Sequence, residues 1–170
     1  MTDSSPLAKS TQTADSSPPL TPSREASLLG NTLSVPDTDA ALIVDDSLLT
    51  GELGAFQTDN GDKGTLRLLS AGLSVQRGDS SYLILPAEVL RVSGVGGVYL
   101  ILLEQTGATF SQRDAQKLGS QISLLRLESD QDLISATTVD SNLGKFPDTQ
   151  AEGGGVTRFR LEGARLIPSR

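Results

Sequence analysis

The sequence contains no cysteine, no histidine and no tryptophan among its 170 residues. Without cysteine, the chain has no disulfide, no thiolate metal ligand and no cysteine nucleophile. Without histidine, it lacks the side chain that most often acts as a general base near neutral pH and as a metal ligand. A serine triad that uses histidine is therefore excluded, and we expect no catalytic residues, no cofactor and no metal site.

Long apolar runs and secretion signals are also missing. No segment approaches the roughly 18 consecutive apolar residues that a membrane span requires. The N-terminus has neither the basic start nor the apolar run of a signal peptide. We therefore expect no membrane partner, and a cytoplasmic protein unless the chain belongs to a larger particle.

Charge is unevenly distributed along the chain. The net charge is −7, from 14 Lys and Arg against 21 Asp and Glu. An acidic body repels phosphate backbones, so we expect no nucleic-acid partner. Residues 145–170 reverse the sign, with five basic and three acidic residues. Two interpretations of this basic end stay open: it pairs with an acidic neighbour, or with the acidic residues of its own body.

The composition changes near residue 39. Residues 1–38 contain 19 Ser, Thr or Pro and no aromatic residue, which leaves too little apolar surface to offset the entropy of ordering them. The sequence therefore predicts a flexible arm, 1–38, followed by one β-rich domain, 39–170. The apolar residues of the arm stand apart from each other and are expected to insert singly into pockets of a partner. These residues are Leu7, Leu20, Leu28, Leu29, Leu33 and Val35.

From residue 40 onward, short apolar runs alternate with turn residues, which is typical of an all-β sandwich or barrel. Asn60-Gly61 is a strong hairpin signal, because both turn positions tolerate positive φ. Residues 98–103 form the most apolar run and are the predicted centre of the core. Pro86 is expected to mark an edge or a bend. The other expected strands are 40–44, 49–56, 65–69, 73–76, 82–85, 89–92, 108–111, 121–127, 133–139, 156–161 and 166–167.

One segment favours a helix. Residues 112–118 fit about two helical turns and are followed by Gly119. The predicted fold class is therefore all-β, a small β-sandwich or barrel-like domain with one short helix at most and an extended N-terminal arm.

Several motifs have simple structural interpretations. Residues 59–64 resemble a calcium loop in composition but lack its ligand spacing and its downstream glutamate, so we interpret them as a hairpin turn. Arg77-Gly78-Asp79 is the tripeptide that integrins recognise, and Gly-Asp is also ordinary turn chemistry. The glycine-rich stretches 94–97 and 153–155 do not match a phosphate-binding loop and are interpreted as a turn and a linker.

The acidic residues do not form a convincing catalytic pair. Asp45 and Asp46 are adjacent, and neighbouring strand residues point to opposite faces. Glu128, Asp130 and Asp132 fall in a polar turn that water reaches. No serine lies in a G-x-S-x-G motif. We expect the chain not to be an enzyme.

A Ser/Thr/Pro-rich arm in front of a compact β domain resembles the lambda-type head decoration proteins of tailed bacteriophages. The resemblance is one of layout and covers the whole chain. It implies a structural protein of the virion, a cement subunit on the capsid surface that binds the major capsid protein and forms a homotrimer. Independently, small β domains must protect their sheet edges, which favours a homo-oligomer.

A second resemblance leads to an alternative function. Residues 64–68, 72–75, 84–92 and 98–110 are similar to the strand sequence of PH and GRAM domains. This resemblance spans residues 64–118. It implies a binding module that recognises a peptide or a lipid.

Overall fold

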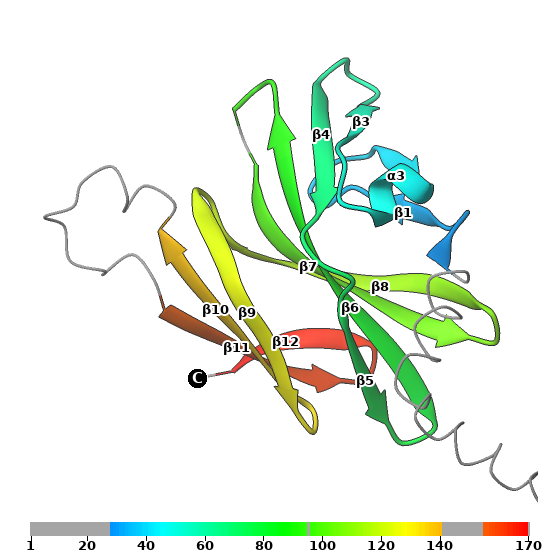
Figure 1. Ribbon diagram of the computed structural model, residues 1–170, viewed down its shortest axis with the longest axis vertical. Helices are drawn as coiled ribbons and strands as arrows, with labels where there is room; N and C mark the ends of the chain where they lie inside the picture. Colours follow the sequence, from blue (N-terminus) through cyan, green and yellow to red (C-terminus); the bar gives the residue numbers. More distant parts are fainter. Residues whose placement is uncertain (1–27, 95, 141–154, 170) are drawn as a thin grey trace, which may run out of the picture.

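The computed structural model describes residues 28–94, 96–140 and 155–169, which form a body built almost entirely of antiparallel strands (Figure 1). The all-β prediction is confirmed. The described elements are β1 (Thr32–Ser34), β2 (Ala41–Ile43), α3 (Asp46–Leu49), β3 (Gly54–Gln57), β4 (Lys63–Leu68), β5 (Leu73–Arg77), β6 (Ser80–Arg91), β7 (Gly97–Thr106), β8 (Thr109–Gly119), β9 (Ile122–Asp130), β10 (Leu133–Asp140), β11 (Gly155–Glu162) and β12 (Arg165–Ser169).

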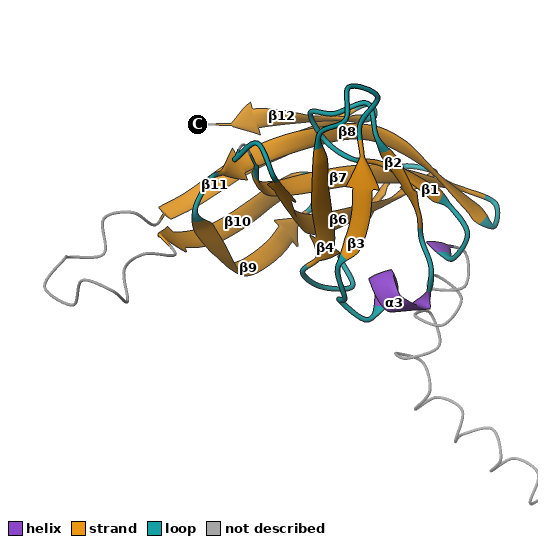
Figure 2. Cartoon of the chain, turned by 90° about the horizontal axis from the view of Figure 1, so that it is seen from above, coloured by secondary structure: helices purple, strands orange, loops and turns teal. Residues whose placement is uncertain are grey.

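The strands form a central sheet, a C-terminal sheet and a small hairpin. The central sheet has the order β3-β4-β6-β7-β8, and β5 pairs with β6 beyond the end of β4. The C-terminal sheet has the order β12-β11-β10-β9, and β1 pairs with β2. Figure 2 shows β9, β10 and β11 towards one end of the molecule and the β1–β2 hairpin with α3 towards the other.

Strands β6 and β7 are buried on both faces. Leu83 and Leu85 of β6 contribute to a first core, whereas Ile84 and the β7 residues Leu100 and Leu102 contribute to a second. Successive strand residues point to opposite faces, so an unbroken apolar run fits a strand that is covered on both sides. The prediction that residues 98–103 lie at the centre of the protein is confirmed.

Residues before 39 belong to this body, contrary to the predicted boundary of the arm. Leu33 is 0% exposed and Val35 is 1% exposed, and both pack with Leu28 in the first core. Residues 32–34 form β1, which pairs with β2. The composition of residues 28–38 concealed this role because only a few apolar side chains supply the buried contacts. We call residues 28–62, which lie over the first core, the cap.

Three local predictions are wrong. Residues 49–56 do not form one strand: a helical turn, α3, precedes β3, and the Asp45 carboxylate caps it by accepting the N–H of Leu48 at 2.9 Å. Aspartate is a favourable N-cap because it satisfies an N–H that the helix leaves free. Gly51, with φ of 91°, then lets the chain turn into β3.

The predicted helix at residues 112–118 is also wrong, because this segment is part of β8. It pairs with β7 over its whole length, for example Ala115 opposite Ile101. The register shifts twice along this pair, near Leu102 and near Val98. Each irregularity disturbs the two-residue alternation of a strand, so the pattern of apolar residues imitates a helix.

Pro86 lies inside a continuous strand, not at an edge or a bend. It sits opposite Leu100 of β7, at the point where the other neighbour of β6 changes from β5 to β4. Its carbonyl oxygen accepts the N–H of Leu69 at 2.9 Å. Proline has no backbone N–H to donate. At Pro86, β5 has ended its pairing with β6 and β4 has not yet begun, so neither of these strands requires an N–H from this position.

Side chains close the remaining gaps between strands. Gln112 of β8 accepts the N–H of Ser34 at 2.9 Å and donates to its carbonyl at 3.2 Å. Asp114 accepts the N–H of Leu166 in β12 at 2.8 Å. These bonds satisfy backbone groups at strand edges. These bonds join β8 to β1 and to β12, and β6, β7 and β8 contribute residues to both cores.

Candidate functional site

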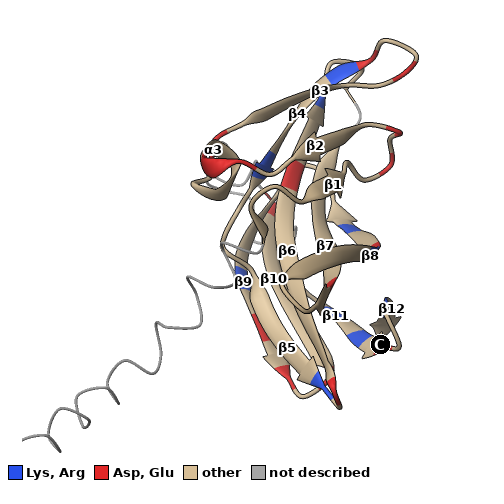
Figure 3. Ribbon diagram, turned by 90° about the vertical axis from the view of Figure 1, so that its right-hand side faces the viewer, with Lys and Arg blue, Asp and Glu red and all other residues tan. Residues whose placement is uncertain are grey.

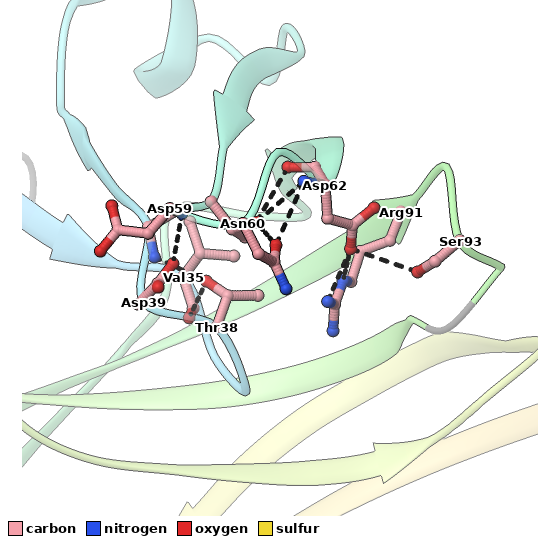
Figure 4. Close-up of polar contacts among 10 residues, drawn as sticks. Val35, Thr38, Asp39, Asp59, Asn60, Asp62, Arg91 and Ser93 are labelled. Carbon is pink, nitrogen blue, oxygen red and sulfur yellow. Dashed lines mark hydrogen bonds and ion pairs between the residues drawn. The ribbon is translucent and has the colours of Figure 1, made fainter.

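A polar pocket of about 390 Å³ lies where the β1–β2 loop, the β3–β4 turn and the end of β6 meet (Figure 4). Its walls carry several polar side chains that hydrogen bonds connect. The lining residues are Asp37, Thr38, Asp39, Thr58, Asn60 and Arg91.

The β3–β4 turn forms one wall of the pocket. Thr58 is 8% exposed, and its hydroxyl donates to the Asn60 side-chain oxygen and accepts the N–H of Asp62 at 3.0 Å. Gly61 has φ of 93°, whereas Asn60 does not have a positive φ, so only the glycine takes the conformation that was expected of both positions. The predicted hairpin is confirmed, and its polar side chains stabilise the turn.

An ion pair holds this turn to β6. The Arg91 guanidinium donates to the Asp62 carboxylate from Nη2 at 2.6 Å and from Nε at 2.7 Å. Ser93 also donates to Asp62, at 3.2 Å. The bond from Arg91 lowers the pKa of Asp62 below its ordinary value, against the opposing effect of desolvation. The bonds from Arg91 and Ser93 therefore fix the orientation of the Asp62 carboxylate.

Tyr99 connects the pocket to the first core. Its hydroxyl donates to Asp37 Oδ2 at 2.7 Å, and its ring is 2% exposed. Burial, followed by the bond to Asp37 and the charge of Asp37, raises the pKa of Tyr99 to about 12, and the charge of Arg91 opposes this shift. The phenol is therefore neutral near pH 7 and acts as a donor that fixes the β1–β2 loop.

The chemistry open to this pocket is limited. Asp62 is bound by Arg91, Asp37 by Tyr99, and Asp39 accepts the N–H of Asp59 at 3.1 Å. Within residues 28–94, 96–140 and 155–169, no group of three or more acidic side chains is arranged to hold a metal ion. The pocket can contact a cationic side chain through its acidic rim, and its polar groups mainly join three loops.

The six residues predicted to bind a partner through the arm differ in where the structure places them. Leu28, Leu33 and Val35 are buried in the first core and are not available to a partner. Leu29 is 45% exposed. Leu7 and Leu20 lie outside the described residues. Of the six, only Leu29 is placed by the structure on the surface.

The other motifs also have structural positions. Arg77-Gly78-Asp79 forms the tight turn between β5 and β6, and the Arg77 guanidinium binds Asp132 at 2.9 Å and the carbonyl of Leu161. Glu128 pairs with Arg126 at 3.2 Å. Among the three glycines 153–155, the first two lie outside the described residues. The tripeptide therefore ties two sheets together and does not present a free arginine.

A second hollow, which the sequence did not reveal, lies beside the start of β9. This groove has a volume of about 450 Å³, and its lining includes the apolar residues Leu90, Val98 and Ile122 together with charged and polar residues such as Glu88 and Arg91. Leu90 is 53% exposed, and Val92, further along the chain, is 80% exposed. The sequence pattern predicted a strand at residues 89–92 but gave no sign that the C-terminal sheet would leave this end of it uncovered.

The glycine-rich turn next to this groove has a packing role. A Cβ on Gly96 would collide with the carbonyl oxygen of Val89, and one on Gly97 would collide with that of Gly119. Close backbone approach therefore explains these two glycines.

No family model matches this chain, and comparisons with curated proteins and with solved structures also found no match. Within the part of the chain that the structure describes, no helix is long and apolar enough to cross a membrane.

Proposed function

We propose that this protein is a non-enzymatic structural subunit that attaches to the surface of a larger assembly, as a decoration or cement protein does on a viral capsid. In this proposal the N-terminal arm, now limited to residues 1–27, and the β body both contact the assembly. The partner is the major capsid protein, and the subunit is a homo-oligomer, with a trimer favoured by the resemblance to phage proteins.

The exposure of large aliphatic side chains on the body carries this proposal. Val92 is 80% exposed, Ile43 is 68% exposed and Leu53 is 58% exposed. Single exposed apolar residues are ordinary, but exposed aliphatic side chains of this size favour contact surfaces, and Leu90, which is 53% exposed, also lines a groove together with Val98 and Ile122. An attaching subunit needs such surfaces and needs no reactive group.

The state of the polar side chains supports the same conclusion. Most of the carboxylates in and around the pocket are engaged by Arg91, Tyr99 or a backbone N–H. A catalytic site requires a group held within reach of a substrate and free to exchange a proton or form a bond. The polar groups here are used to hold loops in position.

The test is the presence of the protein in particles. Particles would be purified by density gradient from cells that express the chain, and the protein would be quantified by mass spectrometry against the major particle protein. We expect the full chain to migrate with the particles in a fixed ratio, and a variant lacking residues 1–27 to be strongly depleted. If the full chain stays at the top of the gradient, the proposal is wrong.

The alternative, a peptide- or lipid-binding module like PH and GRAM domains, predicts a different result. The protein would then co-sediment with phosphoinositide-containing vesicles and would be absent from particles. Vesicle flotation with the same preparation therefore separates the two functions.

A further inference from the structure

The described body has an acidic cap at one end and a basic pair of strands, β11 and β12, within the sheet at the other end. The cap, residues 28–62, contains seven acidic residues and no Lys or Arg. The C-terminal pair of strands, β11 and β12, carries three arginines, Arg158, Arg160 and Arg165, against one acid, Glu162. Figure 3 shows acidic segments over α3 and the loops near β2, and basic segments on β11.

The three arginines lie on one exposed face. Phe159 and Leu161 point into the second core, so Arg158 and Arg160, which alternate with them, point away from it. Leu166 of β12 is likewise buried, which places Arg165 on the outer face beside Glu162, its register partner. We call Arg158, Arg160 and Arg165 the arginine face.

The acidic residues that the structure describes form no ion pair with this face. None of the ion pairs between described residues includes one of its arginines. Glu128 and Asp130 share the outer face of the C-terminal sheet but lie on β9, with β10 between them and β11. Two strand spacings separate the backbones of β9 and β11 by about 10 Å, and no ion pair between described residues joins the two strands. Among described residues, the interpretation that this basic end pairs with its own body therefore has no support.

The cap carries acids that are available for a partner. Asp46, Glu52 and Asp59 are exposed, and no hydrogen bond or ion pair between described residues uses their side chains. The cap and β11 lie at opposite ends of the molecule in Figures 1 and 2. The acids of the cap therefore cannot reach the arginine face of the same copy, but they can reach that of another.

We propose that the arginine face of one copy docks against the acidic cap of a second copy, in a head-to-tail contact. Complementary charge gives such a contact its orientation and speeds its formation. Because the two surfaces differ, repetition produces a ring if the rotation closes and an open filament if it does not. This inference rests on the self-association that the proposed function includes, and it identifies the surfaces that meet.

The experiment is a charge exchange followed by sedimentation velocity. The first variant reverses the arginine face (Arg158→Glu, Arg160→Glu, Arg165→Glu), and the second reverses the cap (Asp46→Lys, Glu52→Lys, Asp59→Lys). A control reverses two exposed arginines elsewhere (Arg67→Glu, Arg113→Glu). Far-ultraviolet circular dichroism and thermal unfolding of each full-length variant confirm that it is folded. Any variant that does not fold is replaced by the same positions changed to Gln or Asn.

We expect the wild type and the control to associate in about 0.1 M NaCl and to dissociate towards about 1 M, as the Debye length falls from about 10 Å to about 3 Å. Each triple variant alone should associate at least about tenfold more weakly, because three exposed charge pairs together contribute on the order of that factor. An equal mixture of the two should recover association, because each copy then offers the surface that the other lacks.

Three results would overturn the inference: a wild type that is monomeric at low salt at every concentration, variants that associate as well as the wild type, or a mixture that stays monomeric. Binding of heparin to the arginine face of a monomeric wild type would indicate an external polyanion as the partner. These outcomes are independent of the gradient experiment, since a monomer can still be recovered on particles.

Discussion

Tyr99 shows how one hydroxyl links the first core to a surface loop. The donor is buried and its acceptor, Asp37, carries the charge, so ionisation of the phenol would place two negative charges side by side in a poorly solvated position. The native state therefore holds the phenol proton more tightly than the unfolded chain does.

This difference predicts a loss of stability at high pH. Between the ordinary pKa of 10.0 and the native value of about 12, the unfolded state releases the proton and the native state keeps it, so the free energy of unfolding falls as the pH rises through this window. Chemical denaturation across the window should show that Tyr99→Phe removes this part of the decline.

In a Tyr82→Phe background, Tyr99 is the only phenol, and its tyrosinate absorbance should have a midpoint near the native value of about 12. A midpoint near the ordinary value would contradict the buried bond.

Asp62 predicts the opposite dependence, at low pH. Its native pKa lies below the ordinary value of 3.8 because Arg91 donates to the charged carboxylate. The bond therefore stabilises the fold above that ordinary value, and this contribution is lost as the pH falls through the native pKa. Asp62→Asn should be less stable than the wild type at neutral pH, and the difference in unfolding free energy should shrink below about pH 4. A difference that does not change with pH would show that the ion pair contributes nothing.

At the scale of elements, the pairing of β4 with β3 on one side and β6 on the other requires a residue without a side chain at Gly64. A Cβ on Gly64 would collide with the carbonyl oxygen of Leu90 and with the ring of Phe56. Backbone cannot move aside as a flexible side chain can, so Gly64→Ala should lower the unfolding free energy by about 1–3 kcal/mol. Urea denaturation measures this directly. Gly155→Ala is a matched control, because a Cβ there meets no atom within 4 Å, and it should change stability by less than about 0.5 kcal/mol.

The sequence correctly predicted a strand that is buried on both faces and a turn that contains a glycine with positive φ. Residues 98–103 form an unbroken apolar run because both faces of β7 are covered, and Gly61 lies in the β3–β4 turn with the positive φ that favours glycine. The segment 112–118 could not be assigned in the same way. It is an outer strand with two register irregularities, so neither its burial nor its periodicity distinguishes it from a helix.

The candidate functional surfaces were harder to predict because they depend on what the C-terminal sheet covers. A local pattern shows that Leu90 belongs to an apolar strand, but not that the second sheet stops short of it. The polar pocket similarly brings together Asp37, Asn60 and Arg91 from three separate segments. The reversal of charge at the C-terminal end was visible in the sequence. Only the strand register shows that its arginines share a face.

At the scale of the whole molecule, the position of the N-terminal boundary predicts the outcome of two truncations. Removing residues 1–27 should leave the unfolding temperature nearly unchanged. Removing residues 1–38 also deletes Leu28, Leu33 and Val35, each of which contributes about 1.5–3 kcal/mol by burial, and typical domains have only about 5–15 kcal/mol in total. The longer truncation should therefore be unfolded or aggregated, as judged by circular dichroism and by limited proteolysis. A cooperative, stable fold without residues 1–38 would restore the arm boundary that the sequence alone predicts.

Because β6, β7 and β8 contribute to both cores, the order of synthesis on the ribosome sets the order in which the two cores can close. The cap is made before the strands it covers, so the first core can close once β8 is complete at Gly119. The second face of the same strands waits for β12, which ends at Ser169. At about 5–20 residues per second, those last 50 residues take several seconds to synthesise. During that interval the nascent chain exposes Ile84, Leu100 and Leu102 on a flat, strand-rich surface. Slow codons or stalls between Gly119 and the C-terminal strands should therefore send this protein to chaperones or inclusion bodies, whereas the same delays before Thr32 should have no such effect.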